Sequence, residues 1–152
     1  MSSTFTAPIR VNTRQTTSND GTISADNTGA VVLSQQVAFV SGATASVVIP
    51  AGSIINNIQV YVNDAATSRA LSLTVNGTTT SVGTISTAAL GVASAAFTAD
   101  AAVANLLANV GAYNCTVTLG TESSSAGTLS VTYTARNSDG TITPYGSGLT
   151  NS

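Results

Sequence analysis

The sequence predicts an all-β protein: an antiparallel β-sandwich or jelly-roll-like single domain with an extended N-terminal arm and one short helix. Three observations support this prediction. The 152 residues include 25 threonines and 20 serines, and only 7% are charged. Apolar and polar residues alternate with period two in many segments, which is typical of half-buried antiparallel strands. Turn-forming pairs such as Asn76-Gly77 separate the alternating segments.

The predicted strands follow one another between residues 31 and 136. Each has apolar side chains on one face and polar side chains on the other. The alternating segments are residues 31–39, 45–49, 58–62, 71–75, 78–85, 113–119 and 128–135. Tyr113 and Cys115 are predicted to share an inward face, and Tyr61 to lie on a polar outer face. We expect eight or so strands in total.

Local signals mark one tight hairpin and one helix. Asn76-Gly77 is a strong hairpin signal because both central residues of such a turn favour positive φ. Asp100 is placed to cap a helix, and Gly111 to stop it. Between them, Val103, Leu106, Leu107 and Val110 follow helical spacing. We expect this helix to connect two strands and to pack an apolar stripe on one end of a sheet.

The chain divides into three parts by composition. Residues 1–30 are polar and contain four of the ten charged residues, so we interpret them as an extended arm and loop. Residues 31–136 form the predicted sandwich domain. Residues 137–152 are predicted to be a turn at Asp139-Gly140 followed by a loose tail rich in Gly, Ser and Thr.

The composition argues against an enzyme. The chain has no histidine, lysine or tryptophan, and one cysteine. Without His or Lys, the usual Ser-His-Asp, Ser-Lys and Cys-His arrangements are impossible. Cys115 lies on the predicted inward face of a strand and is interpreted as a small buried hydrophobe. We predict no catalytic residues and no cofactor.

Carboxylates are the remaining candidates for chemistry. They are Asp20, Asp26, Asp64, Asp100, Glu122 and Asp139. Two close carboxylates in a cleft would permit glycoside hydrolysis, but most of these residues have turn or cap contexts in which Asp is locally favoured. A calcium loop at residues 19–27 stays open as an alternative, although turn-forming polar residues explain it better, and we predict no metal site.

The charge and hydropathy of the sequence limit the classes of binding partner that we expect. The net charge is −2, and the four cations are all arginines, so a broad phosphate-binding surface is not expected and nucleic acid is not a predicted partner. No apolar segment reaches the length of a membrane span, and a membrane is not a predicted partner either. The N-terminal residues lack signal-peptide features, so we expect synthesis in a cytoplasm without export by the standard route.

Several segments carry a resemblance to a known class of proteins. They are VVIPAGSIINNIQVYV at residues 47–62, LSLTVNG at 71–77 and AGTLSVTY at 126–133. Together they resemble small β-sandwich structural proteins of tailed bacteriophages, of the head decoration (cement) or head-fibre type. FTAPIRV at residues 5–11 is similar to the N-terminal arms of these proteins.

The resemblance implies a virion component on the capsid surface, with the major capsid protein as its partner. Decoration proteins clamp shell subunits together by contacts, and an extended arm can add strand-like hydrogen bonds to an exposed edge. The predicted arm residues are Phe5, Ile9, Arg10, Val11 and Arg14. A homo-oligomer is expected, and a three-fold arrangement around a shell axis is our prediction.

Two other functions stay open. A fibre or tail module would bind host-surface glycans through exposed aromatic side chains such as Tyr61 or Tyr145, although the chain has few aromatics. A carboxylate-based polysaccharide hydrolase would need two close, inward-facing carboxylates. Glycan binding in the absence of head binding would distinguish the fibre or tail module from a decoration protein. Enzymatic activity that disappears when the candidate carboxylates are replaced would indicate the hydrolase.

Overall fold

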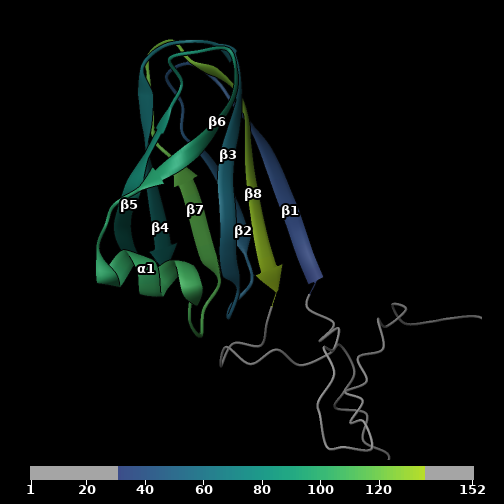
Figure 1. Cartoon of the computed structure of the whole chain (residues 1–152), viewed down its shortest axis with the longest axis vertical. Coiled ribbons are helices and arrows are strands. Elements are labelled where there is room, and N and C mark those ends of the chain that lie inside the picture. The colour runs from purple at the N-terminus through teal and green to yellow at the C-terminus, as the bar shows by residue number, and fades with distance from the viewer. Residues whose placement is uncertain (1–30, 136–152) are drawn as a thin grey trace, which may run out of the picture.

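The computed structural model describes residues 31–135 of the chain (Figure 1). These residues form eight β-strands and one α-helix. In chain order they are β1 (Val31–Phe39), β2 (Ala45–Ile49), β3 (Ile54–Asp64), β4 (Ser68–Val75), β5 (Thr78–Ser86), β6 (Gly91–Phe97), α1 (Ala101–Ala108), β7 (Cys115–Leu119) and β8 (Ala126–Ala135). The prediction of an all-β protein with one short helix is confirmed. The predicted arm at residues 1–30 and the tail at 137–152 lie outside the described residues.

All eight strands belong to one antiparallel sheet that is nearly closed. The order across the sheet is β1-β8-β3-β6-β5-β4-β7-β2. Its two edge strands, β1 and β2, contact each other but do not pair. β6 joins the two halves, because Gly91–Ser94 pairs with β3 and Ala95–Phe97 pairs with β5. In Figure 1, β3, β8 and β1 lie side by side toward the viewer, and β4 and β2 lie behind.

The pairing follows from one hairpin. β4 and β5 are joined at Asn76-Gly77, where φ is 48° and 77°, as predicted for a two-residue turn of this kind. Beyond that hairpin, β3 pairs with β6, β2 with β7 and β1 with β8. The chain is therefore a double-stranded ribbon that begins at this turn and is wound around the core.

Period-two alternation places the core as the sequence predicts. In β8, Leu129, Val131 and Tyr133 are buried, and in β7 the buried residues are Cys115, Val117 and Leu119. These side chains meet those of β2, β3, β4 and β5 in a single apolar cluster. β2, β4 and β7 thus bury one face and leave the other more exposed, whereas β6 has no buried residue.

The helix α1 lies at one end of the sheet, as predicted (Figure 1). Asp100 is its N-cap, and the Asp100 side chain accepts a hydrogen bond of 2.6 Å from the Ala102 amide. Val103 is buried, and Leu106 and Leu107 pack against the core. The helix thereby covers one end of the apolar cluster.

Two local expectations are wrong or incomplete. Tyr113 is exposed rather than on the inward face, because β7 begins only at Cys115 and Tyr113 precedes it in a bend. β6 was not among the alternating segments, since its small residues Ala93, Ser94 and Ala95 differ too little in hydropathy to produce a clear period. This segment forms a strand because it pairs with β3 and β5 in the folded protein.

Candidate functional site

The predicted arm residues lie outside the described part of the chain. They are Phe5, Ile9, Arg10, Val11 and Arg14. The structure does show where the described residues begin and end. Val31, at the start of β1, pairs with Ala135, at the end of β8. Residues 1–30 and 136–152 therefore join the sheet side by side, at the end that also carries α1 (Figure 1).

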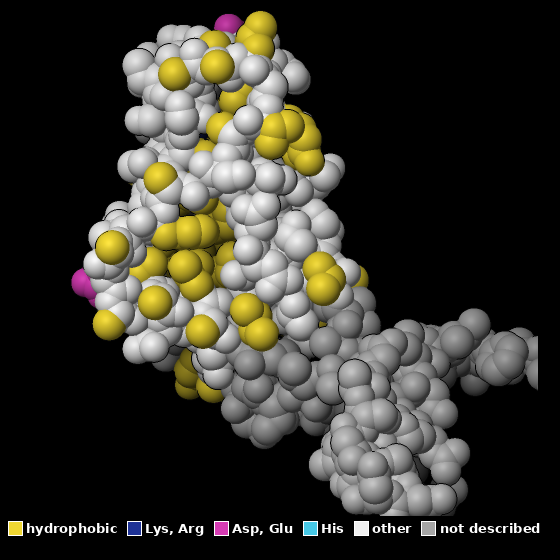
Figure 2. Space-filling view, viewed as in Figure 1, with side chains coloured by type: hydrophobic (Ala, Val, Ile, Leu, Met, Phe, Trp, Pro, Cys, Tyr) yellow, Lys and Arg dark blue, Asp and Glu magenta, His cyan; other side chains and the backbone are white. Residues whose placement is uncertain are grey.

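The described surface carries very little charge. Residues 31–135 contain four ionisable acids and arginines: Asp64, Arg69, Asp100 and Glu122. Asp64 and Asp100 are exposed, whereas the side chain of Arg69 is fully buried and that of Glu122 is 8% exposed. The face in Figure 2 shows isolated acidic groups and no basic group on the described part. Long-range electrostatic attraction from this part of the surface is therefore weak.

The outer face of β1, β8, β3 and β6 carries the exposed Val32, Tyr61 and Val92 together with a row of hydroxyl and amide side chains. By register the hydroxyl and amide residues are Ser34, Gln36, Asn57, Gln59, Ser94, Ser130 and Thr132. Several are joined across strands: the hydroxyls of Ser34 and Ser130 are 3.1 Å apart, and the Gln59 amide donates to Ser94 over 3.2 Å. These ladders hold the polar groups in a regular array.

The opposite face, on β2, β7 and β4, is similar. Ser46 and Thr118 form a hydroxyl pair at 3.0 Å, and Thr74 and Thr79 form another at 2.8 Å. Neutral hydroxyls in such pairs are neither strong acids nor strong bases. Hydroxyl pairs that link neighbouring strands thus occur on both outer faces.

Among the charged residues between positions 31 and 135, Arg69 alone has a fully buried side chain. It lies on β4 on the same face as Leu71 and Leu73. All five guanidinium N–H groups are used. Nε donates to the Ser125 hydroxyl, Nη1 to the carbonyl oxygens of Ala43 and Gly120, and Nη2 to those of Val40 and Ser125, over 2.7–2.9 Å. Its Cζ also lies 4.8 Å from the centre of the Phe39 ring.

Glu122 supplies the opposite charge, with Oε2 3.9 Å from Arg69 Nε. Ser125 lies between them and donates to Oε2 over 2.7 Å. Thr67 and Ser68 donate to Oε1, and the Thr87 hydroxyl donates to Oε2. Burial raises the pKa of Glu122, but the donors Ser125, Thr67 and Thr87 outweigh burial and lower the pKa to about 2.

This Arg69–Glu122 pair ties four loops together at the end of the sheet opposite α1. The loops are β1–β2, β3–β4, β5–β6 and β7–β8. Burial lowers the pKa of Arg69, and the nearby Glu122 charge opposes that change. The groups that Arg69 and Glu122 contact all belong to these loops and the adjoining strands. The pair therefore acts as a structural clamp between the loops. A general acid, by contrast, needs a carboxyl pKa near the working pH.

Sequence reasoning missed the clamp, although a signal for it was present. Arg69 has the same strand parity as Leu71 and Leu73, so the alternation that predicted an inward face for these leucines also places Arg69 inside. Glu122 was one of the carboxylate candidates and lies in a loop as expected. Of the other candidates, Asp64 and Asp100 are exposed, and Asp20, Asp26 and Asp139 lie outside the described residues.

Cys115 lies inside, as predicted from its strand parity. Burial raises the pKa of its thiol to about 11, with a small opposing effect of a backbone contact at Thr74. At neutral pH the thiol is therefore protonated and a poor nucleophile. Within residues 31–135 no group of three His, Cys, Asp or Glu side chains is placed to hold a metal ion. In that same range no helix has the length and apolar character needed to span a membrane.

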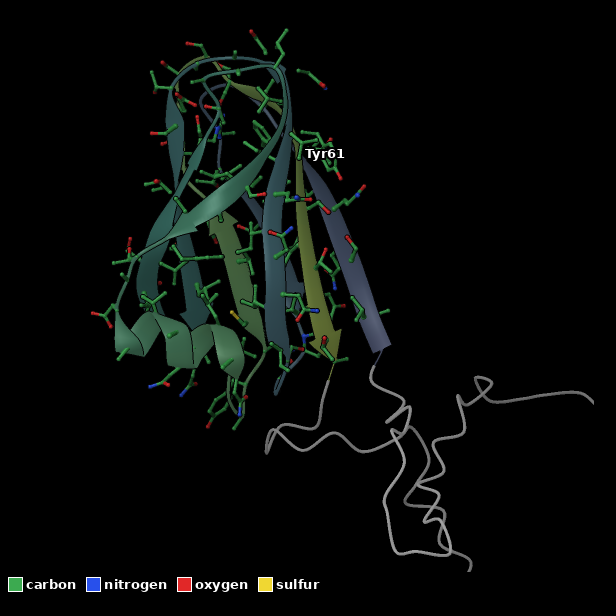
Figure 3. The ribbon with its side chains drawn as sticks, viewed as in Figure 1. Tyr61 is labelled. Atoms are coloured by element: carbon green, nitrogen blue, oxygen red, sulfur yellow. The ribbon has the colours of Figure 1, made fainter. Side chains whose placement is uncertain are left out.

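Tyr61 is the predicted aromatic contact that the structure describes. It points outward from β3, as expected, and is 41% exposed (Figure 3). Its cross-strand partner on β6 is Val92, which is also exposed. Tyr145, the second predicted aromatic, lies outside the described residues.

Comparison with protein-family models, with curated proteins and with solved structures gave no match.

Proposed function

We propose that the nearly closed sheet is a jelly roll, the finer form of the predicted fold. The support is its pairing scheme: β1 with β8, β2 with β7, β3 with β6 and β4 with β5. An eight-stranded ribbon wound in this way corresponds to two Greek keys. Jelly rolls occur in viral capsid proteins and in lectins, so the fold alone leaves more than one function open.

The function that we propose is structural: the chain is a capsid decoration protein of a phage head and stabilises the shell by non-covalent contacts. The observation that carries this proposal is the described surface itself. Between residues 31 and 135 only Asp64 and Asp100 are exposed charges, and hydroxyl and amide side chains share the two outer faces with exposed apolar ones such as Tyr61, Val92 and Val48. Such a surface gives little repulsion between copies and is suited to being covered in an assembly.

The arm is the proposed attachment to the major capsid protein. Phe5, Ile9 and Val11 alternate with polar residues and proline, which suits strand addition to an exposed edge, and Arg10 and Arg14 are proposed to pair with acidic shell residues. The arm joins the sheet beside the C-terminal segment, so the body is held by one end. The three-fold oligomer around a shell axis stays a prediction, as does the location on the virion surface.

Binding to stripped heads tests this function. The full chain is mixed with heads of the carrying phage from which it has been removed, and the heads are sedimented. We expect saturable co-sedimentation, weakened by the pair Arg10→Ala and Arg14→Ala. Asp100→Asn serves as the matched control, because it changes an exposed charge on the body and retains the helix cap. Failure of the full chain to co-sediment would reject the proposal.

Glycan adhesion is the second candidate, and the exposed pair Tyr61 and Val92 favours it. Aromatic side chains commonly line ligand sites. Glycan-array binding lost in Tyr61→Ala and retained in Tyr113→Ala, without head binding, would support this function instead. Both tyrosines are exposed, so the control removes an equivalent aromatic side chain elsewhere.

A further inference from the structure

The strand β1 is an edge strand with a free side. It pairs with β8 on one side, and no described strand pairs with it on the other. Free strand edges invite pairing with another chain, and proteins usually protect them with charges, proline, bulges or short length. β1 contains no charge, proline or bulge, and it contacts the other edge strand, β2, without pairing with it. It is nine residues long, VVLSQQVAF, and its register with β8 is unbroken.

The core-facing side of β1 is also left open at one end. Phe39, beside the turn to β2, is buried, and Val37 is partly buried. Leu33 faces the same way, because it pairs with the buried Tyr133, yet it is 41% exposed. Val32, on the outer face, is 60% exposed. Two neighbouring apolar side chains thus lie uncovered on the strand whose edge is free.

The sequence of β1 is complementary to itself. Antiparallel pairing of two copies about Gln35 sets Leu33 opposite Val37 and Ser34 opposite Gln36. It also sets Val32 opposite Ala38. Moving the centre to Ser34 instead places Leu33 opposite Gln35 and Val32 opposite Gln36, which pairs apolar with polar residues. No charged side chain opposes another in the register centred on Gln35.

We propose that β1 is a homodimer interface: two copies of this chain pair β1 with β1 across a two-fold axis centred on Gln35. The contact joins the two sheets into one continuous sheet and covers Leu33 of each copy with Val37 of the other. It is isologous, as two-fold contacts are. The dimer does not depend on binding to a shell, so its test uses the purified full chain without heads.

A disulfide reports the register. In this dimer the two Gln35 Cα atoms are about 4.5–5.5 Å apart, which is within disulfide range. Gln35→Cys should therefore give a reducible, covalently linked dimer under mild oxidation. Gln36→Cys is the matched control, since its two copies lie diagonally, about 7–8 Å apart, and should link poorly. Cys115 does not interfere because it is buried.

Mass in solution reports the interface. We expect sedimentation equilibrium to give twice the 15.0 kDa mass of one chain. Leu33→Lys, which adds a charge at the edge, should weaken the dimer at least about tenfold. Val48→Lys is the control, because Val48 is similarly exposed but lies on β2.

Three results would overturn the proposal. A monomer at high concentration would mean that another occupant, such as residues 1–30 of the same chain, covers the edge. A mass of three chains would favour the three-fold arrangement. A dimer that tolerates Leu33→Lys, or that links through Gln36→Cys as readily as through Gln35→Cys, would place the interface elsewhere.

Discussion

Arg69 donates four of its five hydrogen bonds to main-chain carbonyl oxygens, in the β1–β2 and β7–β8 connections. These charge-assisted hydrogen bonds from the buried guanidinium hold the two connections in place. Glu122 then balances the charge and accepts from two further loops. At the scale of single residues, this pair is the feature on which the shape of one end of the molecule most depends.

Replacing Arg69 tests the clamp. Arg69→Ala leaves the four carbonyl oxygens without their donor and the Glu122 carboxylate without its opposite charge. Removal of one partner of a buried pair typically costs about 3–5 kcal/mol. We expect a decrease of that size in the free energy of unfolding, measured by urea titration. Asp64→Ala is the control, since Asp64 is exposed. A change below about 1 kcal/mol, the range of exposed ion pairs, would contradict the role of Arg69 as a clamp.

The clamp also predicts a pH dependence. The pKa of Glu122 is lowered from 4.5 to about 2 in the folded state, so its ionised form stabilises the fold. That contribution is complete above about pH 5 and is lost as the pH falls toward 2. Unfolding free energy measured across this range should decline less steeply in Glu122→Gln than in the natural chain. Equal slopes in the two proteins would show that Glu122 does not titrate in this way.

At the scale of elements, α1 depends on its cap. The Asp100 carboxylate accepts from the Ala102 amide, and the first turn of α1 contains no acidic residue. Asp100→Ala should lower stability by about 1 kcal/mol, whereas Asp100→Asn should retain most of the cap. Thermal unfolding of the two variants checks this. If both variants lose the same stability, the charge of Asp100, and not its hydrogen bond, is the stabilising feature.

The sequence predicted elements whose pattern is local. β1 and β2 match the expected ranges, and the Asn76-Gly77 turn and the Asp100 cap are confirmed, because short-range chemistry determines them. β6 was missed because its small residues acquire strand structure only through their neighbours. The clamp escaped prediction for a related reason: its partners are far apart in the sequence. The arm residues Phe5 to Arg14 remain predictions.

At the scale of the whole molecule, the ribbon of residues 31–135 presents two outer faces with few charges and has two edge strands, β1 and β2. The faces carry hydroxyl and amide ladders, the charged pair is enclosed, and both terminal segments join at one end. These features together suit a protein that is held between larger neighbours. The order of the strands and the shape of the sheet could not be predicted from the sequence, because many strand arrangements satisfy the same alternation of apolar and polar residues.

The central claim is our proposal that the chain decorates a phage head, and cryo-electron microscopy of phage particles assembled with this chain present tests it most directly. The account predicts density for the eight-stranded body on the outer surface of the head shell, with residues 1–30 lying against the major capsid protein. Density for the body only on a tail or fibre, or a head surface without it, would contradict the account.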